Sequence, residues 1–256
     1  MELIKPLRAL IVIGHPGHEL GCLHFAALNS CRFYCVSDGA GATGVSRHQL
    51  CHQALVDEGH DGYVNLESII SEPTLFSSIL ESDDTPWIEL VSALRRHIDE
   101  FQPDILLCDG YEGYNPVHDL TAFCALNSSR QLPSVTIPLT KETVEQGKAH
   151  PDDLTVDADS KMAAAKRAYA LKLQSRIPEI PQDDLSLTSY STRSETFRHQ
   201  KSPTLDLEAF EFAQTPFYEK HGDRRVAEGK YTERIGFRSH VKPLMRAILK
   251  KTGIEA

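Results

Sequence analysis

The chain has 256 residues, a length that fits one large α/β domain or a domain with an appended subdomain. Acidic residues outnumber basic ones, 36 to 27, and this balance argues against nucleic acid or an anionic membrane as the main partner. No apolar run reaches ~18 residues and no secretory signal is recognised, so we expect a cytoplasmic protein without a membrane span.

The segment from Arg8 to Phe25 carries the most informative pattern in the chain. Residues 9–13 are apolar and rich in β-branched side chains, which predicts a buried strand. This strand runs into a glycine-broken loop that holds His15 and His18. Ligands of open α/β sheets bind in loops at the carboxyl ends of strands, and a His-x-x-His turn can direct two imidazoles at one metal ion.

The remaining elements are predicted from apolar periodicity and from breaks at glycine, proline and polar clusters. In chain order they are a helix over His24–Asn29, a strand over Cys31–Val36, a helix over Arg47–Val56, a short strand over Tyr63–Leu66, a polar surface connection over Ser71–Pro86, an amphipathic helix over Trp87–Phe101, a buried strand over Asp104–Cys108, a strand over Pro133–Leu139, a helix over Ser160–Gln174 and an irregular surface segment over Ile177–Pro203.

The loop after Cys108 repeats the logic of the first loop. A buried strand again ends in a glycine-broken, polar segment, here Asp109–Asp119, which contains His118. Two such loops of one parallel sheet can face each other across the sheet's edge. The six cysteines include no Cys-x-x-Cys pair. We expect buried free thiols, with a disulfide framework as the less favoured alternative.

The first loop resembles the opening motif of the PIG-L/LmbE-like family of zinc-dependent N-acetylglucosamine deacetylases. That motif reads Ala-His-Pro-Asp-Asp-Glu, and this chain has Gly14-His15-Pro16-Gly17-His18-Glu19. The resemblance implies that His15 is a zinc ligand and that His18 stands where the family has a carboxylate ligand. It also implies that Gly17 stands where the family has its general base.

The second loop resembles the family's second signature, His-Pro-Asp-His. Here that signature reads Asn115-Pro116-Val117-His118, so only the final histidine, the third zinc ligand, is kept. The resemblance implies that Asn115 replaces a histidine that stabilises an oxyanion or carries a proton, and that Val117 replaces the acid that orients it. Glu112 and the glycine after it are similar to a family subgroup with Trp-Glu-Gly-Gly before this signature.

Three further segments carry the resemblance through most of the chain. Ser37-Asp38-Gly39 matches the family's Thr-Asp-Gly, and Arg47-His48-Gln49-Leu50 matches its Arg-x-Glu-Leu without the acid. The segment from Pro216 to Leu244 is similar to the C-terminal extension of some family members. We therefore expect an α/β domain over residues 1–175, with residues 176–256 packing on it as an irregular segment and an extension.

Ala149-His150-Pro151-Asp152-Asp153 is almost identical to the family's opening motif but lies in a different context. It follows a polar segment rather than a buried strand, and it precedes the helix predicted over Ser160–Gln174. A motif without its structural context is a weak signal, and aspartates in loops most often cap turns. We do not expect a metal site there.

The imidazoles of His15, His18 and His118 would form a tetrahedral zinc site with water in the fourth position. Zinc lowers the pKa of such a bound water toward ~7. Because these ligands are neutral, the metal would be a stronger Lewis acid, which offsets part of the loss of the base. Asn115 could donate a hydrogen bond to the oxyanion that develops. The acids nearest in sequence to the two loops are the candidates for proton transfer, and these are Glu19, Asp38 and Asp119.

Side chains beside the predicted metal are candidates for substrate binding, and we take these to be Glu112, Tyr114 and Arg47. His221 and His240, in the C-terminal tail, are further candidates for proton transfer.

The sequence supports three hypotheses on a Rossmann-like α/β fold with a mostly parallel sheet and helices on both faces. The first is a zinc-dependent hydrolase that removes an acetyl or other acyl group from an N-acyl amino sugar or related amide, a small-molecule or glycan substrate. The second is a non-catalytic homologue that binds a glycan or nucleotide-sugar. The third and weakest is a Rossmann nucleotide-binding enzyme, since the Gly-rich stretch after the second strand lacks the Gly-x-Gly-x-x-Gly fingerprint.

Overall fold

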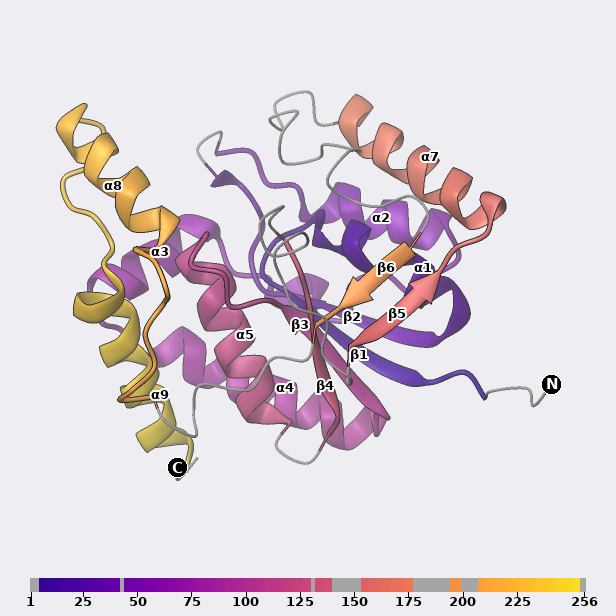
Figure 1. Cartoon of the computed structure of the whole chain (residues 1–256), viewed down its shortest axis with the longest axis horizontal. Helices are drawn as coiled ribbons and strands as arrows, with labels where there is room; N and C mark the ends of the chain where they lie inside the picture. Colours follow the sequence, from indigo (N-terminus) through magenta and orange to yellow (C-terminus); the bar gives the residue numbers. More distant parts are fainter. Residues whose placement is uncertain are drawn as a thin grey trace.

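A parallel four-stranded sheet in the order β2-β1-β3-β4 forms the centre of the molecule (Figure 1). The computed structural model describes residues 5–41, 44–129, 132–139, 153–176, 194–198 and 207–253. The strands of the sheet are β1 (Arg8–Ile13), β2 (Ser30–Cys35), β3 (Ile105–Asp109) and β4 (Ser134–Ile137). This architecture confirms the fold class predicted from the sequence.

The near-continuous apolar runs of β1 and β3 reflect burial on both faces of the sheet. Successive side chains of a strand point to opposite faces. Leu10 and Val12 therefore join one hydrophobic cluster, while Ala9, Ile11 and Ile13 join a second cluster on the other face. A strand without a polar face can only lie at the centre of a three-layered structure, and this is where β1 and β3 lie.

Helices cover both faces of the sheet (Figure 1). On one face lie α1 (Leu23–Leu28), α2 (His48–Asp57) and α7 (Ser160–Arg176), and on the other lie α3 (Glu72–Leu80), α4 (Thr85–Phe101), α5 (Pro116–Ser128) and α9 (Lys242–Thr252). Two short 3₁₀ segments, η1 (His18–Cys22) and η3 (Leu66–Ser68), lie in the connections. Within the described ranges, none of the helices has the length and apolar character needed to cross a membrane.

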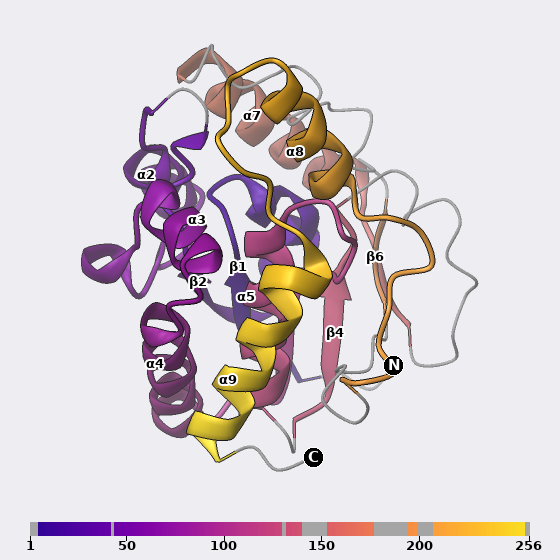
Figure 2. The ribbon, with the colours of Figure 1, turned by 90° about the vertical axis from the view of Figure 1, so that its left-hand side faces the viewer.

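The C-terminal part of the chain folds back onto the helices of the main sheet (Figure 2). It contains α8 (Phe217–Ala227), a π-helical turn η5 (Phe237–Val241) and α9, which packs against α4. On α9 the side chains of Leu244, Met245 and Ile248 are almost completely buried in the same hydrophobic cluster as Leu10 of β1. Each such side chain contributes roughly 1.5–3 kcal/mol of stability, so α9 is an integral part of this core.

A buried carboxylate is one of the contacts that hold a second, two-stranded sheet to the main domain, and an antiparallel bridge between Thr136 and Arg198 is another. It pairs β5 (Leu154–Asp157) antiparallel with β6 (Ser194–Phe197). Glu195 of β6 is 4% exposed and accepts hydrogen bonds from the backbone N–H groups of His24 and Phe25, both at 2.9 Å. Its Oε1 also lies 2.8 Å from the buried Nζ of Lys166. Glu195 thus ties β6 to the start of α1 and to α7.

The polar surface connection predicted over Ser71–Pro86 is wrong. Residues Glu72–Leu80 form α3, and the side chains of Leu75 and Ile79 are completely buried. The signals for this helix are local: Ser71 Oγ accepts a hydrogen bond from the backbone N–H of Thr74, and the two buried residues are spaced i, i+4. Polar residues make up much of this segment, and two of them, Glu72 and Ser78, are buried together with the apolar pair.

Two smaller expectations also fail. Tyr63–Leu66 forms no strand; Tyr63 makes one isolated parallel bridge with Phe33, and the chain then enters η3. The segment Ile177–Pro203 was expected to be irregular, but its described residues include β6, whose Phe197 is fully buried. In both places the backbone pairing comes from tertiary contacts that leave no periodic pattern in the sequence.

All six cysteines lie in the described part of the chain and all are free. The predicted buried thiols are therefore confirmed, except that Cys31 is only partly buried. Burial raises the pKa of Cys31 to about 12, with Glu195 as a second cause, and holds the pKa of the other five thiols above its ordinary value. A raised pKa keeps a thiol in its protonated, less nucleophilic form.

We predict that Glu195→Ala lowers the free energy of unfolding by about 3–5 kcal/mol, because the change breaks a buried ion pair and removes the acceptor of two backbone N–H groups. Urea denaturation followed through the fluorescence of Trp87, the one tryptophan in the sequence, measures this loss. Asp57→Ala is the control, since it breaks the more exposed ion pair between Asp57 of α2 and Lys172 of α7 and should cost at most about 1 kcal/mol. Equal losses in the two variants would contradict the prediction.

Candidate metal centre

The candidate site lies where the order of strands reverses in the sheet. From β1 the chain passes to β2 on one side, and it later returns to β3 on the other side of β1. The carboxyl ends of β1 and β3 are therefore neighbours, with Val12 opposite Cys108 in parallel register. The loops that follow these two strands meet at this edge, which is the usual position of ligand sites in open α/β sheets.

Three imidazoles from these loops lie against one another. The ring centroids of His15 and His118 are 4.6 Å apart, those of His18 and His118 are 4.6 Å apart, and those of His15 and His18 are 5.4 Å apart. His15 lies in the loop after β1, His18 begins η1, and His118 lies in the first turn of α5. The structure thus brings together all three residues that the sequence predicts as metal ligands.

A carboxylate that sequence reasoning missed completes this cluster. Asp109, the last residue of β3, is fully buried, and its Oδ2 lies 3.0 Å from Nδ1 of His18. The same oxygen accepts a hydrogen bond from the backbone N–H of Gly14 at 2.7 Å. Among the described residues, His18, Asp109 and His118 form a group in which one ligand atom from each lies within 4.8 Å of the others.

The hydrogen bonding of this group fits a metal ion. His118 is 5% exposed, and within the described ranges neither of its ring nitrogens has a hydrogen-bond partner. Oδ1 of Asp109 is also buried without a partner there. Burying polar atoms without partners costs about 1–3 kcal/mol each, and a cation that accepts their lone pairs would offset this cost. The donor set of imidazole and carboxylate is one that suits zinc.

The environment controls the charge of each imidazole. Burial, followed by the neighbouring His15 and His18, lowers the pKa of His118, so its ring is neutral and can bind a cation. Burial, together with His18 and Arg47, likewise lowers the pKa of His15. Burial also opposes a proton on His18, but the Asp109 carboxylate outweighs this effect and raises the pKa of His18.

His15 makes polar contacts on both sides of its ring. Nδ1 lies 2.7 Å from Oγ of Ser37 and 3.3 Å from Oε1 of Glu72, while Nε2 lies 3.1 Å from Nδ2 of Asn115. Asn115 is also the N-cap of α5, where its Oδ1 accepts a hydrogen bond from the backbone N–H of Val117 at 2.8 Å. The amide therefore points its N–H₂ group into the cluster and its oxygen into the helix.

The acids predicted to take part in proton transfer hold the loops in place. Glu19 accepts hydrogen bonds from the backbone N–H of Gly17 and from the hydroxyls of Tyr63 and Tyr169, at 2.7, 3.2 and 2.7 Å. Oδ1 of Asp38 accepts from the backbone N–H groups of residues 40 and 72.

Asp119, the third of these acids, accepts from the backbone N–H groups of residues 112 and 113. It is completely buried, and burial raises its pKa to about 8, although these two hydrogen bonds act in the opposite direction.

The predicted substrate-binding residues lie in different environments. Tyr114 is 39% exposed, and its ring is 6.2 Å from that of His118. Glu112 accepts a hydrogen bond from the backbone N–H of Leu139 at 2.8 Å, and Arg47 donates to the backbone oxygen of Gly39 at 2.5 Å. Of the three, Tyr114 is the one that combines contact with the cluster and exposure to solvent.

The C-terminal extension reaches the site through Tyr114. The ring of Phe217 at the start of α8 stacks on that of Tyr114, with centroids 5.0 Å apart and an interplanar angle of 13°. The backbone N–H of Phe217 donates to the backbone oxygen of Gly113 at 2.7 Å. His221 continues this row of rings, with its centroid 5.8 Å from that of Phe217. The other predicted tail histidine, His240, accepts a hydrogen bond from the backbone N–H of Gly236.

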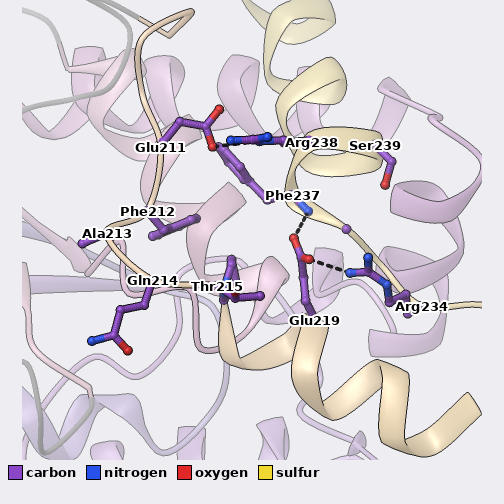
Figure 3. Close-up of a pocket in the computed structure, with 12 residues that line it drawn as sticks. Glu211, Phe212, Ala213, Gln214, Thr215, Glu219, Arg234, Phe237, Arg238 and Ser239 are labelled. Carbon is purple, nitrogen blue, oxygen red and sulfur yellow. Dashed lines mark hydrogen bonds and ion pairs between the residues drawn. The ribbon is translucent and has the colours of Figure 1, made fainter. Parts of the chain in front are cut away.

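Two other features stand apart from the cluster. Of the second His-Pro-Asp-Asp motif, residues 149–152 lie outside the described residues, and Asp153 forms an ion pair with Arg198 at 2.8 Å. A cavity of about 540 Å³ lies between the segment before α8 and η5 (Figure 3). The arginines in its wall are already paired, Arg234 with Glu219 and the highly exposed Arg238 with Glu211.

The residues missed by sequence reasoning left different signals. Asp109 directly follows the apolar residues of β3, and His15 comes two residues after those of β1, so the same strand-end argument could have identified Asp109. Glu72 lies in the segment taken for a surface connection, and its contact with His15 follows from tertiary packing alone. Ser37 belongs to a segment that matches a family motif, but its hydrogen bond to His15 leaves no separate pattern in the sequence.

The fold and the site together define an α/β protein with an imidazole–carboxylate cluster at the switch point of a parallel sheet. No protein-family model and no curated protein sequence matches the chain. Solved structures do match. A deacetylase in the biosynthesis pathway of teicoplanin has 15% identity and a TM-score of 0.51, over 74% of this chain and 96% of that chain.

The A40926 pseudoaglycone deacetylase has 13% identity and a TM-score of 0.51, over 77% of this chain and 99% of that chain. A conserved protein from Thermus thermophilus has 18% identity and a TM-score of 0.50, over 77% of this chain and 95% of that chain. The chain therefore has the fold of the PIG-L/LmbE-like deacetylases, as the sequence motifs predicted.

We predict that Tyr169→Phe lowers the free energy of unfolding by roughly 1–3 kcal/mol, because it removes a donor from the buried carboxylate of Glu19. Chemical denaturation monitored by far-ultraviolet circular dichroism measures the change. Tyr231→Phe is the matched control, since that ring is 44% exposed and should lose less than about 0.5 kcal/mol. A loss at Tyr169 no larger than that at Tyr231 would contradict the anchoring role of Glu19.

Proposed function

We propose that this protein is a zinc-dependent hydrolase that removes an acetyl or other acyl group from an N-acyl amino sugar or a related amide. The observation that carries the proposal is His118, whose buried ring has no hydrogen-bond partner among the described residues and lies against His15 and His18. The deacetylase activity named for two structures of the same fold supports the choice of reaction.

The reaction breaks the amide C–N bond. A water oxygen adds to the acyl carbon, the amine leaves with a proton, and a carboxylic acid and a free amino sugar result. A divalent metal bound at the cluster would polarise the amide carbonyl and make water a better nucleophile at neutral pH. His18 and His118, which come from the two loops, would hold that metal, together with a third ligand that the family resemblance assigns to His15.

Asn115 is suited to stabilise the oxyanion. Its Nδ2 points into the cluster, 3.1 Å from Nε2 of His15, and its orientation is fixed because its other amide atom caps α5. A donor held in place before the reaction needs no reorganisation when charge develops on the carbonyl oxygen. In this proposal Glu19, Asp38 and Asp119 position the loops through the hydrogen bonds described above.

Tyr114 is the residue we assign to substrate contact at the rim of the site. It lies next to His118, is partly exposed, and is supported from behind by the stacked ring of Phe217. Aromatic rings at the mouth of a site provide apolar surface for the ring or acyl chain of a substrate. Glu112 and Arg47 support this region by holding the neighbouring backbone.

A non-catalytic homologue that binds a glycan is the second candidate, and Gly17 favours it. This residue stands where the family has its general base, and it adopts a φ of 110° that residues with a side chain rarely adopt. The local backbone is thus adapted to glycine at that position. A binding protein would retain the fold, the loops and the aromatic rim without needing a base.

We expect purified protein to contain about one zinc per chain and to release acetate from N-acetylglucosamine or from an N-acetylated glycoside. His118→Ala should lose both zinc and activity, because its imidazole is a ligand in every arrangement considered. Elemental analysis and an acetate assay measure these quantities, and circular dichroism checks that the variant is folded. Zinc without acyl release from any N-acyl amino sugar would favour the binding function, and no zinc in the wild type would refute the proposal.

We predict that Asn115→Ser lowers kcat about 10²–10³-fold with little change in KM, because serine retains an N-cap acceptor but removes the amide donor. Steady-state kinetics on the best N-acyl substrate measure both constants. Thermal unfolding should be nearly unchanged, which shows that the cap of α5 is kept. A parallel rise in KM with constant kcat would show that Asn115 binds the substrate in its ground state instead.

A further inference from the structure

The acids that the family carries in its first loop are missing here, but a carboxylate still reaches the cluster from another element. Gly17 and His18 occupy the positions of the two aspartates, and Asp109 approaches from the end of β3. Asp109 has no exposed surface, and its Oδ2 contacts both Nδ1 of His18 and the backbone N–H of Gly14. A buried charge requires such partners, so its position is not an accident of packing.

The second carboxylate oxygen of Asp109, Oδ1, lacks a hydrogen-bond partner. It is buried and, among the described residues, accepts no hydrogen bond. The two ring nitrogens of His118 are in the same condition, and the ligand atoms of His18, Asp109 and His118 converge within 4.8 Å. Three ligand-type side chains, two of them with unsatisfied buried atoms, therefore converge on one point.

His15 differs from these three residues. Both of its ring nitrogens already have polar neighbours: Ser37 and Glu72 at Nδ1, and Asn115 at Nε2. It is also absent from the group whose ligand atoms converge. The histidine that the family motif makes a ligand is thus the one whose hydrogen bonding is most complete without a metal.

Gly14 provides the room that Asp109 needs. A Cβ at this position would lie 2.9 Å from Oδ2 of Asp109 and 3.3 Å from Cδ2 of His118, closer than side chains normally approach. The family motif has alanine here, and this chain has glycine. Two of the positions at which this chain differs from the first motif, Gly14 and His18, are therefore both in direct contact with Asp109.

We propose that the metal-binding carboxylate of this protein has moved from the first loop to the end of β3, so that His18, Asp109 and His118 are the three ligands and His15 lies beside the metal. This assignment rests on the proposed function only in that a metal binds at the cluster. It retains one carboxylate and two imidazoles, a ligand set found in catalytic zinc sites. His15, with Asn115 and Glu72, then forms the polar wall next to the metal.

The test compares zinc affinities of the full chain in competition with a chromophoric chelator. We expect Asp109→Asn to weaken zinc binding at least ~100-fold, and His15→Gln to weaken it less than ~10-fold. Asn can still accept the hydrogen bond from Gly14, so the fold should persist, and circular dichroism in the presence of a chelator checks this. Glu195→Gln is the matched control, since it also turns a buried, hydrogen-bonded acid into an amide, and it should leave the affinity unchanged.

A second variant tests the exchange itself. His18→Asp in the Asp109→Asn background returns the acid to the position where the family motif has it. We expect this double variant to bind zinc within ~10-fold of the wild type, and we expect its binding now to depend on His15. Absorption spectra of the cobalt-substituted proteins should show a changed ligand field in Asp109→Asn and an unchanged one in Glu195→Gln.

The outcomes separate this inference from the proposed function. If wild type binds zinc but hydrolyses no N-acyl substrate, only the function is refuted, and the affinities still test Asp109. Equal affinity of Asp109→Asn and wild type, or a larger loss in His15→Gln than in Asp109→Asn, would overturn the assignment of Asp109. Failure of the double variant to recover zinc binding would overturn the inference that the ligand carboxylate has moved from the first loop to the end of β3.

Discussion

The parallel pairing of β1 with β3 is the constraint on which the candidate site depends. Because both strands run in the same direction, the residues that follow them emerge at one edge of the sheet. The hydrogen bond from the backbone of Gly14 to Asp109 joins the two strand ends at this edge. The parallel register of the two strands brings residues almost a hundred positions apart into one cluster.

Buried acids define the shape of the loops around the cluster. Glu19 holds the turn after β1 between two tyrosine hydroxyls, and Asp119 holds residues 112 and 113 through their backbone N–H groups. Each acid accepts hydrogen bonds from backbone or hydroxyl donors that the loops do not pair among themselves. The loops are therefore held by buried acid side chains rather than by regular secondary structure.

Much of this arrangement could be predicted from the sequence. The apolar runs of β1 and β3, the glycine-broken loops and the motif histidines led to the correct fold and to three imidazoles that do meet. Patterns of this kind are local, and local patterns determine where strands end. The expectation for the segment of α3 failed because only two apolar residues, Leu75 and Ile79, mark its buried face.

The contacts of individual acids could not be predicted in the same way. Asp38 and Glu19 are prominent in the sequence because they match a motif, and the structure gives both of them backbone partners. Asp109 and Glu72 match no motif, yet they are carboxylates that form ion-pair contacts with imidazoles of the cluster. Which acid reaches a site depends on side-chain direction at a strand end or helix start, and that direction is set by packing between distant elements.

Moving a ligand from a loop to a strand end changes how precisely it is held. Asp109 belongs to β3, which is hydrogen-bonded to β1 on one side and to β4 on the other, whereas His18 follows a glycine with positive φ in a short turn. A carboxylate on a central strand has less backbone freedom than one in a loop, so less entropy is lost when it binds a cation.

A carboxylate also brings a full negative charge to the cation, which strengthens binding and reduces its Lewis acidity compared with three neutral imidazoles. In such a site more of the stabilisation of a developing oxyanion must come from fixed donors. The amide of Asn115, oriented by the helix that it caps, is such a donor.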